Sequence, residues 1–158
     1  MLREVHKPMA DFSIQVDWRR TTPDFDAKTF DRSHLWHLAG GQTVQGSAAP
    51  DYSGDPNRSN PEEALLAALS SCHMLTFLTI AALRKLVVDR YEDEPTAELG
   101  KNSKGKMMVA RLILRPRVMF GGAVQPDAET IQELHRKAKE NCFIGNSLLS
   151  EMAVEPRF

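Results

Sequence analysis

The chain has 158 residues, of which 42% are apolar and 26% are charged. This is the composition of an ordinary folded domain that is long enough to bury a hydrophobic core. The formal net charge is −1, which gives no electrostatic reason to expect a nucleic acid or an anionic membrane as partner. We therefore expect a single domain over residues 1–158 that binds neither.

The first thirteen residues, MLREVHKPMADFS, lack the apolar core of a secretory signal. We therefore expect the protein in a reducing cytoplasm, where cysteines are more often catalytic or metal-binding than structural. The two cysteines, Cys72 and Cys142, and the scattered histidines show no paired spacing typical of a zinc site. We expect neither a metal nor a cofactor.

Three patterns organise the chain before residue 61. Residues 12–18, FSIQVDW, alternate between apolar and polar, which predicts a half-buried strand. Residues 34–38 and 42–47 flank Gly40-Gly41, a dipeptide suited to a tight hairpin turn. Residues 49–60 are rich in Pro, Gly, Ser, Asp and Asn, which indicates a loop.

A long helix is predicted from about residue 61 to 85. Asn60 can cap it, Pro61 suits its first position and Glu63 can close a capping box. Residues 64–83 contain no charged side chain and are long enough to span a bilayer. Polar side chains cluster at their centre, however, where lipid disfavours them most. We therefore predict a fully buried core helix.

Two longer strands are predicted next, over residues 87–99 and 107–120, around the polar turn 101–106. A second helix starts at Pro126-Asp127, and a short last strand includes Met152 and Val154. One face of the second helix carries an apolar row, while His135 is interpreted as surface. The row consists of Ile131, Leu134, Ala138 and Cys142.

These elements predict an α+β fold, with antiparallel sheets around a long central buried helix and a second, amphipathic helix. A helix that is apolar on all sides is difficult to cover in so short a chain. We therefore expect a homodimer, with the long helix near the interface.

The two cysteines differ in their setting. Cys72 lies in the middle of the uncharged run, beside Ser70, Ser71 and His73. His73 points about 100° away from Cys72 around the helix, so the two do not form an adjacent catalytic pair. Cys142 ends the amphipathic row, where a plain core thiol is the alternative reading. Together they suggest redox chemistry at sulfur.

Three groups of residues form distinctive fragments along the chain. Residues 30–34 are Phe-Asp-Arg-Ser-His, residues 60–63 are Asn-Pro-Glu-Glu, and residues 70–75, around the first cysteine, are Ser-Ser-Cys-His-Met-Leu. The second cysteine lies within residues 141–147, Asn-Cys-Phe-Ile-Gly-Asn-Ser, and Leu-His stands at residues 134–135. Together and in this order the fragments resemble the OsmC/Ohr family of organic hydroperoxide-reducing thiol peroxidases. Residues 60–63 and 70–75 resemble the motif of its first cysteine, and residues 30–34 resemble the Tyr-Ser-Arg-x-His element of one subgroup, with Phe and Asp in place of its Tyr and Ser. Residues 134–135 and 141–147 resemble that subgroup's second-cysteine motif.

The resemblance implies a fold and a mechanism. The fold is an OsmC-like, intertwined homodimer. Cys72 attacks an organic hydroperoxide and becomes a sulfenic acid, and Cys142 then condenses with it to a disulfide. A dithiol, such as a lipoyl-type compound, restores both thiols. Apolar residues around both cysteines suit an alkyl or fatty-acid hydroperoxide.

The resemblance also implies two further site residues. The thiolate is the reactive form and burial disfavours it, so a nearby cation is required. Arg32 matches the family's arginine, with Arg19 and Arg20 as alternatives, and Glu62 matches the glutamate that orients it. Glu62 lies about 15 Å from Cys72 along the helix. We therefore expect a site at the dimer interface that mixes residues of both subunits.

Other functions remain open at this point. A cysteine hydrolase would use Cys72 with His34 or His37 as base, although no nucleophile elbow is present and Cys142 would have no role. A hydrogen-bonded structural role is the simpler reading of both histidines. A non-catalytic binding or stress protein of the same family is the second alternative.

Overall fold

The computed structural model describes residues 11–158, and its contacts divide the chain after Pro61 into two units. The expectation that the first thirteen residues form no secretory signal concerns residues that lie mostly outside the described part. The single domain over residues 1–158 stays a prediction.

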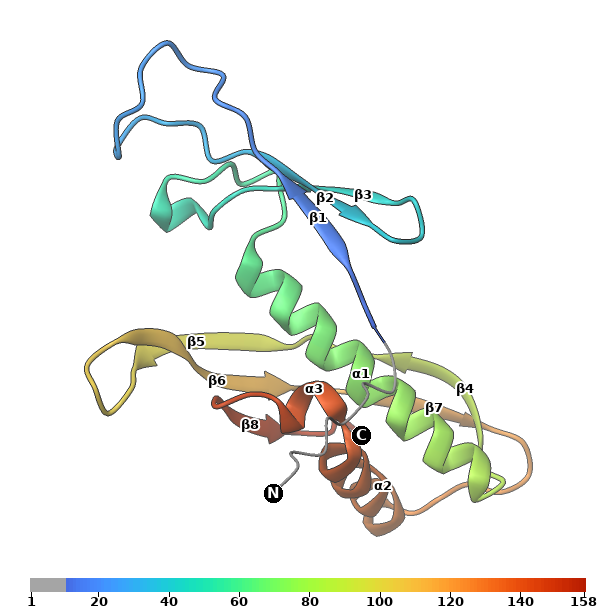
Figure 1. Ribbon diagram of the computed structural model, residues 1–158. Helices are drawn as coiled ribbons and strands as arrows, with labels where there is room; N and C mark the ends of the chain where they lie inside the picture. The colour runs from blue at the N-terminus through green and yellow to red at the C-terminus, as the bar shows by residue number, and fades with distance from the viewer. Residues whose placement is uncertain (1–10) are drawn as a thin grey trace, which may run out of the picture. The chain divides into compact units, whose positions relative to one another are not determined.

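The first unit is built on a three-stranded antiparallel sheet, in the order β1-β2-β3, with the bounds Ile14–Asp17, His34–Leu38 and Thr43–Gly46 (Figure 1). The turn between β2 and β3 is held by two hydrogen bonds between backbone groups, from Leu38 to Gln42 and from Gly41 to Leu38. Gly41 has a φ of 82°, a left-handed conformation that favours glycine. The predicted first strand and hairpin are confirmed, but the expected half-burial of that strand is wrong in the described chain, where Ile14 and Val16 are 62% and 59% exposed. A short 3-10 helix, η1 (Pro50–Tyr52), follows within the loop.

The long helix α1 spans Pro61–Leu83 and ends two residues before the predicted position. Lys85 has a φ of 59°, so the chain leaves the helix in the left-handed conformation typical of a C-terminus. The backbone N–H of Leu86 donates to the carbonyl of Ala81 and satisfies one of the last free acceptors.

The predicted pair of long strands is wrong in detail, because each strand breaks in two. The hairpin consists of β4 (Val87–Glu92), β5 (Thr96–Lys101), β6 (Met107–Leu114) and β7 (Arg117–Gly121). Strand β4 pairs with β7, and β5 pairs with β6, so one long hairpin contributes to two sheets. The breaks fall at Pro95 and Pro116, which lack the N–H that a ladder needs.

The C-terminal part adds two helices and a strand. Helix α2 (Ala128–Asn141) starts where predicted, and the Asp127 side chain caps it by accepting from the Thr130 N–H at 2.8 Å. A short helix that the pattern did not predict, α3 (Phe143–Asn146), follows Cys142. Strand β8 (Glu151–Val154) runs parallel to β6, so the third sheet, β5-β6-β8, is mixed.

Two apolar clusters form the core of the second unit, and α1 contributes to both. Leu69 packs with Leu112, Leu114 and Cys142. The other cluster contains Phe77, Ala81, Leu134 and Ala138. The fully buried residues of α1 form a single row at four-residue spacing, namely Leu69, His73, Phe77 and Ala81. The helix is thus central to the core, as predicted, but in this chain its full burial is limited to that row.

Among the described helices, α1 alone is long and apolar enough to cross a membrane. Its buried row packs against sheet residues and α2, and His73 is hydrogen bonded within that core. These contacts are those of a core helix. The α+β prediction, with sheets around a long central helix and a second helix, is confirmed. The expectation that the sheets are antiparallel throughout is wrong, because β8 pairs in parallel with β6.

Candidate thiol site and its groove

The second unit brings Cys72 and Cys142 together, although 70 residues separate them in the sequence. Cys72 lies in the middle of α1, and Cys142 links α2 to α3. Both are free thiols, and Cys72 packs against the cluster that contains Cys142. Burial and a hydrogen bond with the Cys72 thiol raise the pKa of Cys142 to about 11, so Cys142 stays protonated at neutral pH.

The two thiols differ in their access to solvent. Cys142 is fully buried, whereas Cys72 is half-buried and lines a groove of about 880 Å³. The Cys142 sulfur accepts a hydrogen bond from the Gly145 N–H at 3.3 Å and thereby caps the start of α3. Cys72 is therefore the thiol that a molecule in the groove meets.

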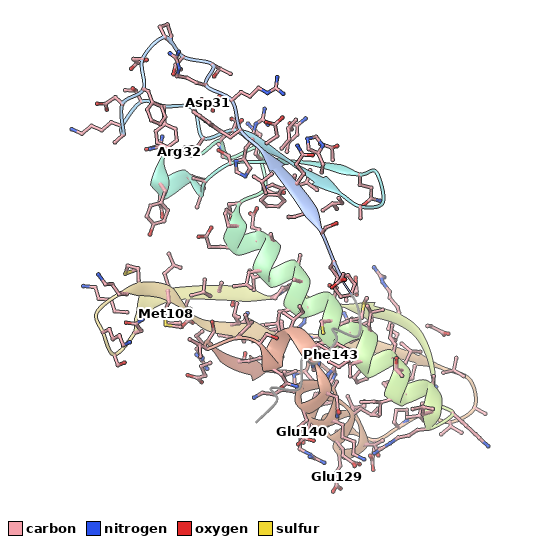
Figure 2. The ribbon with its side chains drawn as sticks, viewed as in Figure 1. Asp31, Arg32, Met108, Glu129, Glu140 and Phe143 are labelled. Atoms are coloured by element: carbon pink, nitrogen blue, oxygen red, sulfur yellow. The ribbon has the colours of Figure 1, made fainter. Side chains whose placement is uncertain are left out.

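Side chains of α1, α2 and the α3 segment line this groove. Phe143 lies at the start of α3 (Figure 2). Its side chain is 80% exposed and lines the groove. Apolar side chains dominate the lining, namely Ala68, Leu75, Ile80, Phe143 and Ile144. A groove of this size and character suits a largely apolar small molecule.

The polar neighbours of Cys72 in the sequence are engaged elsewhere. Ser70 donates to the Asp93 carboxylate at 2.6 Å, and Ser71 donates to the Ala67 carbonyl at 2.6 Å. His73 points into the core. The hydrogen bonds of these three side chains direct them to partners other than the Cys72 sulfur.

His73 and His135 form a buried, hydrogen-bonded pair. His73 Nε2 lies 3.1 Å from His135 Nδ1, and the parallel rings have centroids 5.4 Å apart. Burial lowers the pKa of His73 to about 4 and, together with the neighbouring His73, that of His135 to about 3. The prediction that His135 lies on the helix surface is wrong. His135 follows Leu134 on the side of α2 that meets α1, where it also stacks on Phe77.

Arg32 belongs to the first unit, in the loop that leads into β2 (Figure 2). Its guanidinium donates to the carbonyls of Phe30 and Ala27 at 2.9 and 2.8 Å and lies 4.2 Å from the centre of the Phe30 ring. These contacts hold the arginine within its own loop. Its predicted role beside Cys72 stays a prediction.

The alternative arginines also have partners nearby. Arg19 lies 3.6 Å from the Asp17 carboxylate, and Arg20 donates to the carbonyls of Thr22 and Pro23. Glu62 is half-buried in the first turn of α1, where its charge complements the helix dipole. Its predicted role in orienting an arginine remains untested by these contacts.

The remaining histidines have local structural partners. His34 Nδ1 lies 2.8 Å from the Arg32 carbonyl, and His37 Nδ1 lies 3.2 Å from the Thr43 hydroxyl. Both belong to the first unit, whereas Cys72 belongs to the second. Across residues 11–158, no three His, Cys, Asp or Glu side chains gather as a metal site would require.

Among the groove residues that escaped the sequence prediction are Lys137 and Asn141, both on α2. They follow Glu133 at four-residue spacing, so they share one helix face, next to the buried row of Leu134 and Ala138. That periodicity was visible in the sequence. What it could not show is that this face borders Cys72.

Comparison with known proteins places the chain in a family. The family model described as OsmC-like protein matches residues 54–157. No curated protein matches the chain. An OsmC-like protein of unknown function from Vibrio cholerae is 40% identical, with a TM-score of 0.91 over 94% of this chain and 100% of that one.

More distant structures share the fold. An organic hydroperoxide resistance protein OsmC from Legionella pneumophila gives a TM-score of 0.70 at 13% identity, over 95% of this chain and 97% of that one. The organic hydroperoxide resistance protein OhrB of Bacillus subtilis gives 0.70 at 17% identity, over 95% and 100%. The protein is thus an α+β protein with a paired-thiol site. It belongs to the OsmC-like family, as the sequence motifs predicted.

Proposed function

We propose that the protein is a thiol-dependent peroxidase that reduces organic hydroperoxides to alcohols. The observation that carries this proposal is the contact between two thiols of which only Cys72 borders a groove. Cys142 lies behind it, buried and protonated. The names of the Legionella and Bacillus proteins support the same chemistry by analogy.

The reaction begins at Cys72. Its thiolate attacks one oxygen of the hydroperoxide, the O–O bond breaks, and the other oxygen leaves and takes a proton as the alcohol. Cys72 is thereby oxidised to a sulfenic acid. The Cys142 thiol then attacks that sulfur, an S–S bond forms and water leaves. An external dithiol of lipoyl type reduces the disulfide by exchange and is itself oxidised to a disulfide.

Arg32 and Glu62 complete the proposed site. Arg32 would supply the cation that favours the Cys72 thiolate, since a guanidinium stays charged and can donate to both sulfur and peroxide oxygen. Glu62 would orient it. We propose a cytoplasmic homodimer in which these groups come from both subunits.

The test measures consumption of cumene hydroperoxide with dihydrolipoamide as reductant. We expect turnover by the wild type and none by Cys72→Ser. With Cys142→Ser we expect one oxidation event and a sulfenic acid that dimedone traps on Cys72. Arg32→Met should slow oxidation of Cys72 at least tenfold, whereas Arg19→Met should leave it unchanged.

The groove also favours a second function, a non-catalytic binding protein for apolar molecules. The second function would be established, and the first refuted, by one result: the wild-type protein has two free thiols and binds such molecules, yet consumes no hydroperoxide. A cysteine hydrolase would instead keep its activity in Cys142→Ser, because that mechanism has no role for the second thiol.

A further inference from the structure

The polar groups of the groove beside Cys72 are almost all engaged within their own helices. Ser71 donates to Ala67, Thr76 donates to Cys72, and Thr79 donates to Leu75, in each case to a backbone carbonyl one turn earlier. These residues therefore present a satisfied surface to the groove. The Asn141 amide likewise donates to the Lys137 carbonyl at 2.9 Å.

Lys137 is different, because it is the one charged residue among those that line the groove in the described chain. Its side chain is 40% exposed, and its ammonium lies 3.3 Å from Glu133 Oε1. An ammonium carries three N–H donors, and this ion pair engages one of them. The remaining donors can serve a bound molecule.

Glu133 does not neutralise Lys137, since it is already paired with Arg84. The Arg84 guanidinium donates to both Glu133 oxygens, at 3.2 and 2.9 Å, and ties the end of α1 to α2. Hydrogen bonds from Arg84 and Lys137 lower the pKa of Glu133 to about 2, so the carboxylate stays ionised throughout the physiological range. Two cations and one anion leave a net charge of +1 beside an apolar groove.

We propose that Lys137 is a specificity-determining residue that selects amphiphiles with a terminal carboxylate. The carboxylate lies at Lys137, and the alkyl chain lies along the apolar wall that leads to Cys72. This inference rests on the proposed peroxidase function for its substrate, which becomes the hydroperoxide of a free fatty acid. Lys137 would distinguish the free acid from its neutral ester. A groove with apolar walls alone would bind both equally well.

Binding is measured first, without any turnover, on the Cys72→Ser protein with decanoate and 1-decanol as probes, by titration calorimetry at pH 7.5. These probes share a ten-carbon chain and differ in the end group. We expect decanoate to bind more tightly than decanol, by about fivefold, the upper range for a partly exposed ion pair. Lys137→Met should abolish this preference, and Lys137→Arg should keep it.

Lys139→Met is the matched control. It removes the same charge from the same helix but lies outside the groove lining. It should therefore retain the preference for decanoate. Equal binding of the two probes to the parent protein, no binding of either, or equal effects of Lys137→Met and Lys139→Met would each overturn the inference.

A second arm separates this inference from the peroxidase proposal. With the full wild-type protein, kcat/KM is compared for a fatty-acid hydroperoxide and its methyl ester. Turnover of both at equal kcat/KM would keep the peroxidase and overturn the role of Lys137. Lys137-dependent binding of decanoate without any turnover would support the carboxylate site and refute the peroxidase.

Discussion

At the scale of single residues, the thiol pair owes its asymmetry to burial. Cys142 has no solvent access, and desolvation together with the neighbouring Cys72 thiol disfavours its charged form. Cys72 is half-buried and borders the groove. One thiol is placed to react with an incoming molecule, and the other is placed to react with its neighbour.

We expect iodoacetamide to modify Cys72 well before Cys142 in the folded, reduced protein at pH 8. With a pKa of about 11, roughly a thousandth of Cys142 is thiolate at that pH, and the alkylating reagent cannot reach a buried sulfur. Peptide mass mapping over time measures both rates. Unfolding in urea is the control and should make the two rates similar. Equal labelling in the folded state would contradict the assignment of roles.

At the scale of elements, Asp93 connects three segments of the second unit. It lies in the bend between β4 and β5, accepts from Ser70 on α1, and accepts from the Arg115 N–H in the bend between β6 and β7 at 2.6 Å. Both breaks of the long hairpin thus meet at one carboxylate. The position of α1 on the sheets depends on the same group.

Replacing Asp93 by Ala should lower the free energy of unfolding by about 1–3 kcal/mol, because a partly buried N–H and a hydroxyl both lose their acceptor. Urea denaturation measures the loss. Glu94→Ala is the neighbouring control. The Glu94 side chain is 78% exposed and forms a surface ion pair with Arg157, so we expect a change below about 1 kcal/mol. Equal effects of the two substitutions would show that the hydrogen bonds of Asp93 with Ser70 and Arg115 do not stabilise the fold.

At the scale of the whole molecule, the histidine pair makes stability depend on pH. His73 and His135 sit in the core between α1 and α2, with one unpartnered ring nitrogen each. Asp93 favours and Lys139 disfavours the charged form of His73, but burial outweighs both and keeps its pKa low. A neutral pair needs one donor and one acceptor across the 3.1 Å contact, which a doubly charged pair cannot provide.

We expect the protein to lose stability as the pH falls from about 6.5 to 4. In that window the histidines of the unfolded chain bind protons. In the folded protein they stay neutral, because the pKa is about 4 for His73 and about 3 for His135. Stability is therefore complete above pH 6.5, and each histidine removes up to about 1.4 kcal/mol per pH unit below it. Urea unfolding at several pH values measures this slope.

The double variant His73→Leu/His135→Leu should show a shallower slope between pH 6.5 and 4, with the remainder due to other groups. His37→Gln, an exchange in the first unit, serves as control and should keep the wild-type slope. A slope that the double variant leaves unchanged would show that the pair does not limit stability in acid.

The local pattern of the sequence was enough for much of the fold. Alternation, Gly40-Gly41 and the Asp127 cap act over a few residues, so the first sheet and the start of α2 could be predicted. The α+β class and the family followed from the same patterns together with the ordered cysteine motifs.

Contacts between distant segments required the tertiary structure. Sequence spacing does not predict that Cys72 contacts Cys142, that His73 contacts His135, or that Lys137 lines the groove beside Cys72. In each case one side belongs to α1 and the other to α2 or to the residue that ends it, and only the packing of the two helices brings them together. The split of the hairpin at Asp93 and Pro116 likewise depends on which sheet each half joins. Sequence periodicity determines which face of a helix is apolar, whereas the packing of the whole chain decides what that face meets.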